Sequence, residues 1–205
     1  MELRKHFNLN KSLNEKLLHS FYLQTNVIDL ARQLIGKVLV TNFNNRYTSG
    51  IISETEAYNG VVDRASHAYN GRRTPRNETM FAMGGTSYVY ICYGMHHLFN
   101  VVTNVKDEPH AVLIRNIIPL EGIEIMQRRR NKNVTDKTFS TGPGTASVVL
   151  GINKQHNGLL LSGNEIWIED GKTKIEENQI IVTPRIGVES AGKDALLPYR
   201  FLLKR

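Results

Sequence analysis

Two glutamates and a tyrosine occupy alternate positions in the segment ISETEAY, which covers residues 52–58. Successive side chains of a strand point to opposite faces, so Ile52, Glu54, Glu56 and Tyr58 are expected to share one face. The acid at position 56 and the ring at position 58 would then line the same surface. A solvated strand face also carries charges, so either glutamate could instead be an exposed surface charge.

A second group of aromatic residues lies in the segment YVYICYG, residues 88–94. Alternation places Tyr88, Tyr90 and Cys92 on one face of a strand, and Tyr93 falls at a turn beside Gly94. Tyrosine rings are common in protein cores, because they supply a large apolar area. A ring at a hairpin tip has less to pack against, and could stack on a nucleic-acid base or enter the minor groove as a wedge.

Arginines cluster in two further segments of the sequence. Arg72, Arg73 and Arg76 lie in GRRTPRN, and MQRRRNK supplies a second cluster at 128–130. Each cluster alone is typical of a solvated charge run, whereas both beside stacking aromatic rings indicate a nucleic-acid surface. The formal net charge of +7 is compatible with a polyanionic partner, although solubility alone could explain it.

Several classes of site find no support in the sequence. Cys92 is the one cysteine, so an intramolecular disulfide or a cysteine-rich zinc site is excluded. His96, His97 and His110 lack the spacing of a known metal motif, so no metal is expected. Neither a GxGxxG nor a Walker loop is present, which predicts no nucleotide cofactor, and no GxSxG elbow supports a serine hydrolase.

The periodicity of the sequence predicts mixed helices and strands. A helix capped by Thr25 or Asn26 should end at Gly36, and strands are expected at 38–43, 47–58, 88–92, 98–102 and 110–120. Short helices are expected after Leu120 and after the Gly-Pro turn at 142–143, with late strands near 164–170 and 179–189. The elements do not alternate as βαβ units, which favours an α+β fold with a largely antiparallel sheet.

The chain length of 205 residues suits one domain. We assign residues 21–205 to this domain and residues 1–20 to a flexible N-terminal arm, because that segment is polar and partly basic. The start of the chain lacks the apolar core of a secretory signal, and no apolar run approaches the ~18 residues of a membrane span. We therefore expect no membrane association and an intracellular location.

Several motifs, taken together, resemble one known family. They are ETEAY (54–58), ASH (65–67), RTPRNETMF (73–81), GTSYVYICYGMHHLFNVV (85–102), AVLIR (111–115), GPG (142–144) and PRIGV (184–188). The chain resembles the alkyladenine (3-methyladenine) DNA glycosylases of the mammalian alkyladenine glycosylase type, from about Ala31 to Phe201. The resemblance implies a single compact domain around a curved antiparallel sheet, with surrounding helices, a hairpin that projects into the DNA minor groove, and no metal.

The resemblance also assigns roles to individual residues. Glu56 matches the general base, and Arg115 matches a residue beside the catalytic water and the DNA backbone. Tyr58, His67 and Tyr90 match the pocket that packs around the flipped base. Tyr93 matches the wedge that fills the gap left in the duplex. Asn100 matches the residue that disfavours guanine. The chain departs from the family at Thr145, where a lysine is usual after GPG, and it lacks the tryptophan common after AG near the end.

The implied activity is that of a monofunctional DNA glycosylase in base excision repair. Such an enzyme flips alkylated or deaminated purines out of duplex DNA and hydrolyses the N-glycosidic bond, leaving an abasic site. The expected partner is double-stranded DNA with damaged purines, bound by a monomer in the nucleoid of a bacterium or the nucleus of a eukaryote. The alternative is a non-catalytic module that binds damaged DNA, which could dispense with Glu56.

Overall fold

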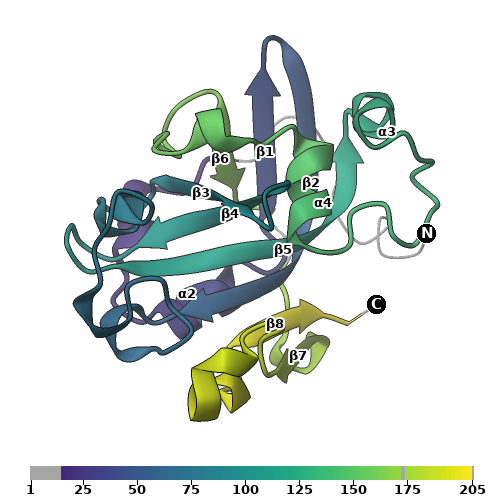
Figure 1. The fold of residues 1–205 in the computed structure, drawn as a ribbon. Helices are drawn as coiled ribbons and strands as arrows, with labels where there is room; N and C mark the ends of the chain where they lie inside the picture. The colour runs from purple at the N-terminus through teal and green to yellow at the C-terminus, as the bar shows by residue number, and fades with distance from the viewer. Residues whose placement is uncertain (1–14, 172–173, 205) are drawn as a thin grey trace.

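The architecture is an eight-stranded, largely antiparallel sheet that curls and carries helices on its faces and edges (Figure 1). The computed structural model describes residues 15–171 and 174–204. The strand order is β3-β4-β5-β2-β1-β6, with β8 pairing to β2 and β7 to β8. The strands are β1 (Val38–Phe43), β2 (Arg46–Tyr58), β3 (Ser87–Cys92), β4 (His96–Thr103), β5 (His110–Glu121), β6 (Ile166–Glu169), β7 (Ile180–Thr183) and β8 (Arg200–Leu203).

Helices are short and either precede β1 or lie between strands along the chain. The α-helices are α2 (Val27–Gln33), α3 (Ile123–Arg130) and α4 (Pro143–Leu150). The 3₁₀ helices are η1 (His19–Leu23), η2 (Gly60–Val62), η3 (Tyr69–Gly71), η4 (Glu78–Phe81), η5 (Lys154–His156), η6 (Glu177–Gln179) and η7 (Glu189–Leu196). This arrangement confirms the predicted α+β class with an antiparallel sheet in one domain.

The N-terminus of α2 is capped as the sequence predicts. The Asn26 side chain accepts hydrogen bonds from the backbone N–H groups of Ile28 and Asp29, at 3.1 and 3.3 Å. These bonds satisfy donors that have no partner inside the first turn of a helix. Beyond the helix, Gly36 adopts a φ of 86°, a left-handed conformation that glycine tolerates best.

The long strand β2 passes through the middle of the sheet and carries the ISETEAY segment. It pairs with β1, β5 and β8, and its residues from Thr48 to Ala57 are buried. The β1–β2 turn places Asn44 and Asn45 at positive φ, which suits a tight two-residue hairpin. Because strands and loops cover both faces of β2, its glutamates are not on a solvated face.

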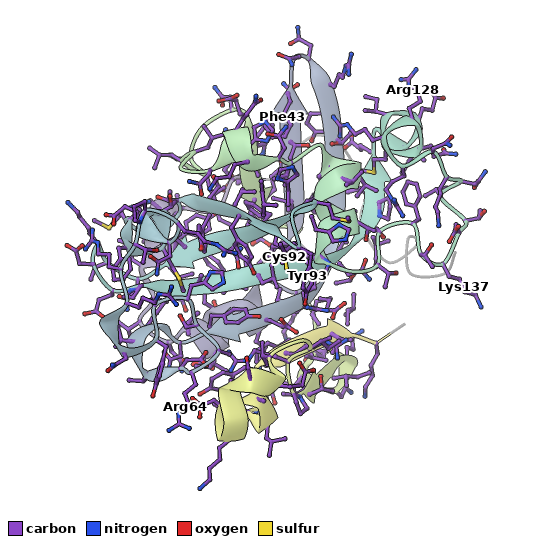
Figure 2. All side chains as sticks on the ribbon, in the orientation of Figure 1. Phe43, Arg64, Cys92, Tyr93, Arg128 and Lys137 are labelled. Carbon is purple, nitrogen blue, oxygen red and sulfur yellow. The ribbon has the colours of Figure 1, made fainter. Side chains whose placement is uncertain are left out.

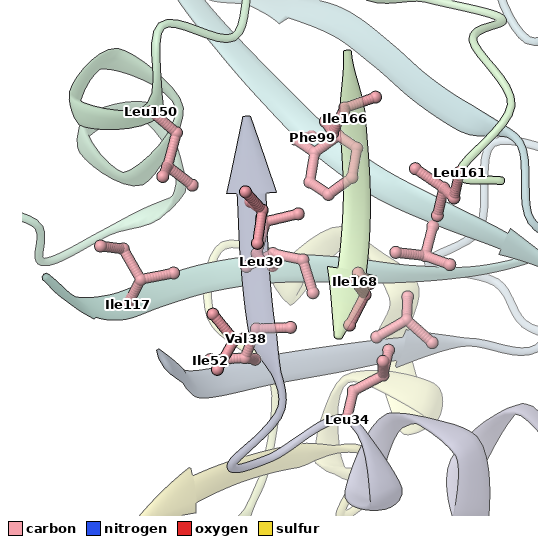
Figure 3. Close-up of a cluster of buried hydrophobic side chains, with 14 of the residues drawn as sticks. Leu34, Val38, Leu39, Ile52, Phe99, Ile117, Leu150, Leu161, Ile166 and Ile168 are labelled. Carbon is pink, nitrogen blue, oxygen red and sulfur yellow. The ribbon is translucent and has the colours of Figure 1, made fainter. Parts of the chain in front are cut away.

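The main hydrophobic core lies between the curled sheet, α2 and α4 (Figure 3). Leu34, Leu39 and Phe99 are among its fully buried members. Ile52 also belongs to this core, although simple alternation placed it on the face of Glu54 and Glu56. The register with β5 shifts between Ile52 and Glu54, so the alternation expected from the sequence is interrupted there.

The flexible arm was predicted over residues 1–20. Residues 1–14 lie outside the described residues. From residue 15 on, the chain is attached to β6 and the residue after it. The backbone N–H of Asp170 donates to the carbonyl of Glu15, and the backbone N–H of Leu17 donates to the carbonyl of Ile168. Lys16 forms an antiparallel β-bridge with Glu169. The described segment 15–20 is therefore part of the domain. No helix in the described part of the chain is long and apolar enough to cross a membrane.

Candidate active site

A cavity of about 490 Å³ opens where the ends of β2, β3, β4 and β5 meet the loop after β7 and the start of α4. This volume lies in the range of ligand-binding cavities. Four residues predicted to form a base pocket line it, namely Tyr58, His67, Tyr90 and Asn100. Arg115 and Tyr93 line it too. The structure thus brings together residues that are up to 57 positions apart in the sequence.

Glu56 lies directly beneath the cavity wall and is fully buried. One carboxylate oxygen accepts from the hydroxyl of Tyr58 at 3.0 Å and lies 3.2 Å from Nη1 of Arg115. The other oxygen accepts from the backbone N–H of Ile186 at 2.8 Å. Tyr58, Arg115 and Ile186 all line the cavity, so the carboxylate is separated from it by the side chains and backbone that hold it.

Burial and charge act in opposite directions on this carboxyl group. Burial raises the pKa of Glu56 above its ordinary value, and the charge of Arg115 lowers it. The hydrogen bonds from Ile186 and Tyr58 lower this pKa further, and the negative charge of Glu54 raises it. A carboxylate with a raised pKa that still has a cationic partner is suited to accept a proton near neutral pH.

A bulge in the sheet aims Arg115 at both glutamates. Glu54 pairs with Asn116, and the next residue of β2, Thr55, pairs with Ile114, so Arg115 is the extra residue of β5. Its Nε donates to Glu54 at 2.9 Å while Nη1 faces Glu56. Bulges next to functional sites commonly redirect a side chain in this way. Glu54 is therefore buried in an ion pair, which contradicts its possible placement as an exposed surface charge.

The aromatic wall of the cavity is held by contacts between its rings. His67 and Tyr90 pack edge to face with ring centroids 4.6 Å apart, and Tyr88 and Tyr90 lie 5.4 Å apart. Nδ1 of His67 is hydrogen-bonded to the hydroxyl of Tyr88 at 2.9 Å. Burial, followed by the charges of Arg76 and Arg72, lowers the pKa of His67. The lowered pKa favours the neutral form of the ring, which can stack on a cationic ligand without repelling it.

Tyr93 occupies the tip of the β3–β4 hairpin, as predicted. Its side chain is 88% exposed, and its φ of 51° is uncommon for a non-glycine residue. Ile91 and Met95 flank it and are exposed too. Figure 2 shows Tyr93 near the middle of the view, with Arg64 and Arg128 on opposite sides of it. An exposed apolar tip beside a cavity is unusual unless it contacts a partner.

The predicted basic residues divide into two groups. Arg72 and Arg76 border a second cavity of about 400 Å³ next to the first, and Arg76 also lines the first. Arg73 instead forms ion pairs with Glu78 and with Asp107 at 2.7 Å, and its guanidinium lies 4.5 Å from the centre of the Phe81 ring. Arg73 is thus engaged within the protein, so its geometry favours a structural role more than the expected contact with a backbone phosphate.

The second arginine cluster, at the end of α3, also serves the fold. Arg129 donates to the hydroxyl of Thr48 and to the carbonyl of Val149, at 3.1 and 2.8 Å. Arg130 donates to the carbonyl of Phe139 at 3.1 Å. Two arginines of this run therefore tie α3 to neighbouring segments. A charge run in the sequence does not reveal which of its members find carbonyl partners in the folded chain.

A buried ion pair supports the site, and the sequence did not single it out. The guanidinium of Arg185 forms two hydrogen bonds to the Asp63 carboxylate, and both side chains are almost fully buried. Arg185 also donates to the carbonyl of Ala57 at 2.9 Å, and it lies 4.9 Å from the centre of the Tyr58 ring. Asp63 in turn accepts from the backbone N–H groups of Asn59 and Ala65, at 3.0 Å each.

This pair joins the loop after β2 to the segment that contacts Glu56. The loop carries His67, and Ile186 follows Arg185 directly. The PRIGV motif contains Arg185, so it was a signal in the sequence, but its partner could not be identified without the fold.

Within residues 15–171 and 174–204, no group of three or more His, Cys, Asp or Glu side chains is placed to hold a metal ion.

Comparison with known proteins gives a consistent result. The family model described as Methylpurine-DNA glycosylase (MPG) matches residues 20–205. A protein of Chlamydia abortus named "Putative 3-methyladenine DNA glycosylase" is 47% identical over 188 residues, which cover 91% of this chain and 97% of that relative. A protein of the same name from Clostridium perfringens is 43% identical over 197 residues, which cover 92% of this chain and 96% of that relative.

Proposed function

The chain belongs to the methylpurine-DNA glycosylase family, and we propose that it releases alkylated or deaminated purines from duplex DNA, leaving an abasic site. The observation that carries this proposal is the Glu56 carboxylate, held by Arg115 and Tyr58 immediately beneath a cavity with aromatic walls. Such a site provides a proton acceptor next to a space for a flat ring. We propose the same residue roles as in the mammalian alkyladenine glycosylase type.

The target bond of a purine nucleotide is inaccessible within a stacked duplex. The nucleotide must therefore be rotated out of the helix, at a cost of a few kcal/mol that is smallest for damaged or mispaired bases. Tyr93, exposed at the hairpin tip, is suited to fill the vacated space. Tyr58, His67 and Tyr90 would recover stacking on the extruded base, worth roughly 1–3 kcal/mol per base.

Hydrolysis then needs an activated water on the opposite side of the sugar from the leaving base. The water oxygen forms a bond to C1′ while the N-glycosidic bond breaks. The electron pair of the N-glycosidic bond leaves with the base. Glu56 accepts the proton of the water and, while ionised, stabilises the positive charge that develops on the sugar. Because Glu56 is covered in the free protein, the water would reach it by taking the place of the Tyr58 hydroxyl, which donates to the carboxylate.

The chemistry of the cavity favours hydrolysis without a strand-cleaving step. A bifunctional enzyme would need an amine to attack C1′ and form a Schiff base. None of the described residues that line the cavity is a lysine, and Thr145 stands where the family usually has one. Strand scission is therefore expected only after the abasic product is treated with alkali.

Incubation with duplex oligonucleotides, each carrying one lesion, tests the proposed function. Free base should be released, and the strand should break at the lesion on alkaline treatment. The full burial of Glu56 favours one alternative, a module that binds damaged DNA without catalysis. If the protein bound the lesion-bearing duplex but released no base, for every lesion tried, that result would support the alternative. We propose a monomer, since one chain supplies the cavity and the wedge, and a site of action inside the cell.

Asn100 is expected to act as a filter against guanine. Its side-chain amide donates to the backbone carbonyls of Tyr88 and Leu98, at 3.1 and 3.3 Å, so its position in the cavity wall is fixed. A fixed side chain at the base edge would clash with the 2-amino group of guanine, which hypoxanthine lacks. Asn100→Ser should raise excision of guanine relative to hypoxanthine by roughly ten- to hundredfold.

Single-turnover rates for guanine and hypoxanthine opposite thymine check this prediction. An equal fall in both rates would show that Asn100 only anchors β4 to β3. Such a role is compatible with its two backbone contacts. Circular dichroism of the variant would confirm that the hairpin is retained.

Arginines near the cavity should differ in their effect on DNA binding. Arg72→Ala is expected to weaken binding and to reduce the magnitude of the log–log salt slope by about one, because one phosphate contact is lost. Arg73→Ala is the matched control, since Arg73 is paired with Glu78 and Asp107. Fluorescence anisotropy at several salt concentrations measures both slopes. A larger loss for Arg73→Ala would reverse the assignment.

A further inference from the structure

The ion pair between Arg115 and Glu56 is part of a longer row of alternating charges. Oε1 of Glu54 accepts from Nε of Arg115 at 2.9 Å and from Nε of Arg200 at 2.7 Å. The row therefore runs Arg200, Glu54, Arg115, Glu56, from strand β8 to the carboxylate beneath the cavity wall. The side chains are 18% exposed at Arg200, 8% at Glu54, 11% at Arg115 and 0% at Glu56, so the row is buried most deeply at its Glu56 end.

The sheet register brings these four side chains to one place. Arg200 of β8 is the cross-strand neighbour of Glu56 on β2, and Leu202 is the neighbour of Glu54. Arg115 reaches the same side through the bulge in β5. Arg200 is also near Thr183 of β7, to whose hydroxyl it donates at 3.3 Å. Three strands that are distant in sequence thus contribute charges to one buried row.

Two of these charges have no role in the proposed chemistry but affect the group that has one. Glu54 and Glu56 share the cation of Arg115, and the negative charge of Glu54 disfavours ionisation of Glu56. If Arg115 were the only cation available to Glu54, the two carboxylates would compete for it. Arg200 supplies a second cation on the far side of Glu54, so that competition is relieved.

We propose that Glu54 and Arg200 are positioning residues for the glycosylase reaction. Glu54 aims the guanidinium of Arg115 at Glu56, and Arg200 neutralises Glu54 so that the charge of Arg115 remains available to Glu56. This inference rests on the proposed role of Glu56. Strand β8 would then contribute to catalysis through Arg200. Arg200 itself is not one of the described residues that line the cavity.

The pH dependence of the reaction distinguishes this role from a purely structural one. The titratable and charged groups that face Glu56 are Glu54 and Tyr58 of β2, Tyr90 of β3, Arg115 of β5 and Arg185 of the segment after β7. Base release requires ionised Glu56, so its rate falls on the acidic side as Glu56 becomes protonated. Removing the charge of Arg200 leaves Arg115 as the cation that Glu54 and Glu56 share. This competition raises the pKa of Glu56 and moves the acidic limb of the pH–rate profile to higher pH.

The test measures single-turnover base release against pH for the wild type, Arg200→Gln, Glu54→Gln and the double variant. Arg200→Gln should move the acidic limb up by about half to one pH unit. Glu54→Gln should move it down, because a negative neighbour is lost, while the rate on the plateau falls roughly 10- to 100-fold as Arg115 loses its anchor. Because Arg200 acts through Glu54, the double variant should match Glu54→Gln in both limb and plateau.

Matched controls complete the experiment. Arg200→Lys keeps the charge and should keep the wild-type limb. Arg32→Gln removes another cation close to β8, where Arg32 lies over the Phe201 ring, and should leave the limb unchanged. Should Arg200→Gln melt below the assay temperature, the comparison of Glu54→Gln with the double variant still applies, because position 54 carries no charge in either protein.

Three results separate the possibilities. A limb that does not move in Arg200→Gln, or a double variant clearly slower than Glu54→Gln, would overturn the positioning role. The same conclusion would follow if the limbs of Glu54→Gln and the double variant differed from each other. Absence of base release by the wild type on every lesion would instead overturn the proposed function itself, so the two failures are distinct.

Discussion

Glu56→Gln is expected to abolish base release while leaving binding of the lesion-bearing duplex largely intact. The amide keeps the shape of the carboxyl group and can still accept the hydrogen bond from the Ile186 N–H. It cannot take a proton from water at neutral pH, and it has no charge to stabilise the developing cation on the sugar. Loss of a general base typically costs 10²–10⁴-fold, and the lost charge adds to this.

Single-turnover release and anisotropy with the same alkylated duplex measure the two effects separately. Glu124→Gln is a suitable control, because Glu124 is an exposed acid in the first turn of α3 and does not line the cavity. It should retain wild-type release. Near-wild-type release by Glu56→Gln would remove Glu56 from the mechanism and leave its buried contacts with a purely structural meaning.

Asp63→Asn is expected to destabilise the fold by about 3–5 kcal/mol, because it leaves the charge of Arg185 buried without its partner. Both side chains are almost fully buried, and Asp63 also accepts two backbone N–H groups of its own loop. The loss should lower the urea midpoint strongly. It should also reduce activity near the unfolding transition, since this loop follows Tyr58 and carries His67 to the cavity.

The exposed pair of Arg73 and Glu78 is the control for the stability experiment. Glu78→Gln should leave the urea midpoint nearly unchanged, because an exposed pair is screened by solvent. Combining Asp63→Asn with Arg185→Met should recover part of the stability, since no charge is then stranded. An Asp63→Asn protein with the wild-type midpoint would show that Arg185 is satisfied by the carbonyls of Ala57 and Asp194 alone.

Local signals in the sequence were sufficient for many elements of the fold. The helix cap at Thr25 or Asn26, the break between the strands at 38–43 and 47–58, and the β3–β4 hairpin were each predicted from residues within a few positions of one another. Each of these features depends on backbone geometry that a short segment specifies by itself. The position of Tyr93 at an exposed tip followed from the same kind of signal.

The contacts that organise the site were not accessible in this way. The bulge that exposes Arg115 to two glutamates depends on the register between β2 and β5, which lie far apart in the chain. The same holds for the pairing of Arg185 with Asp63, 122 residues away, and of Arg200 with Glu54, 146 residues away. Family resemblance assigned Glu56 and Arg115 to the site, but only the fold shows which groups hold them.

The charge runs illustrate the same limit from the opposite direction. Arg73 and Arg129 were grouped with possible DNA contacts because they lie in basic segments. In the folded chain, Arg73 pairs with two carboxylates, and Arg129 donates to Thr48 and Val149. Whether an arginine is available to a ligand depends on the acceptors that tertiary structure brings near it.

Release of free base from a duplex with a single alkylated purine, followed by chromatography of the products, tests the central claim most directly. The wild-type protein should release the base and leave an intact strand that breaks at the lesion only after alkali, whereas Glu56→Gln should bind the same duplex and release none. Tight binding by both proteins with no free base from either, across alkylated and deaminated purines, would contradict the account.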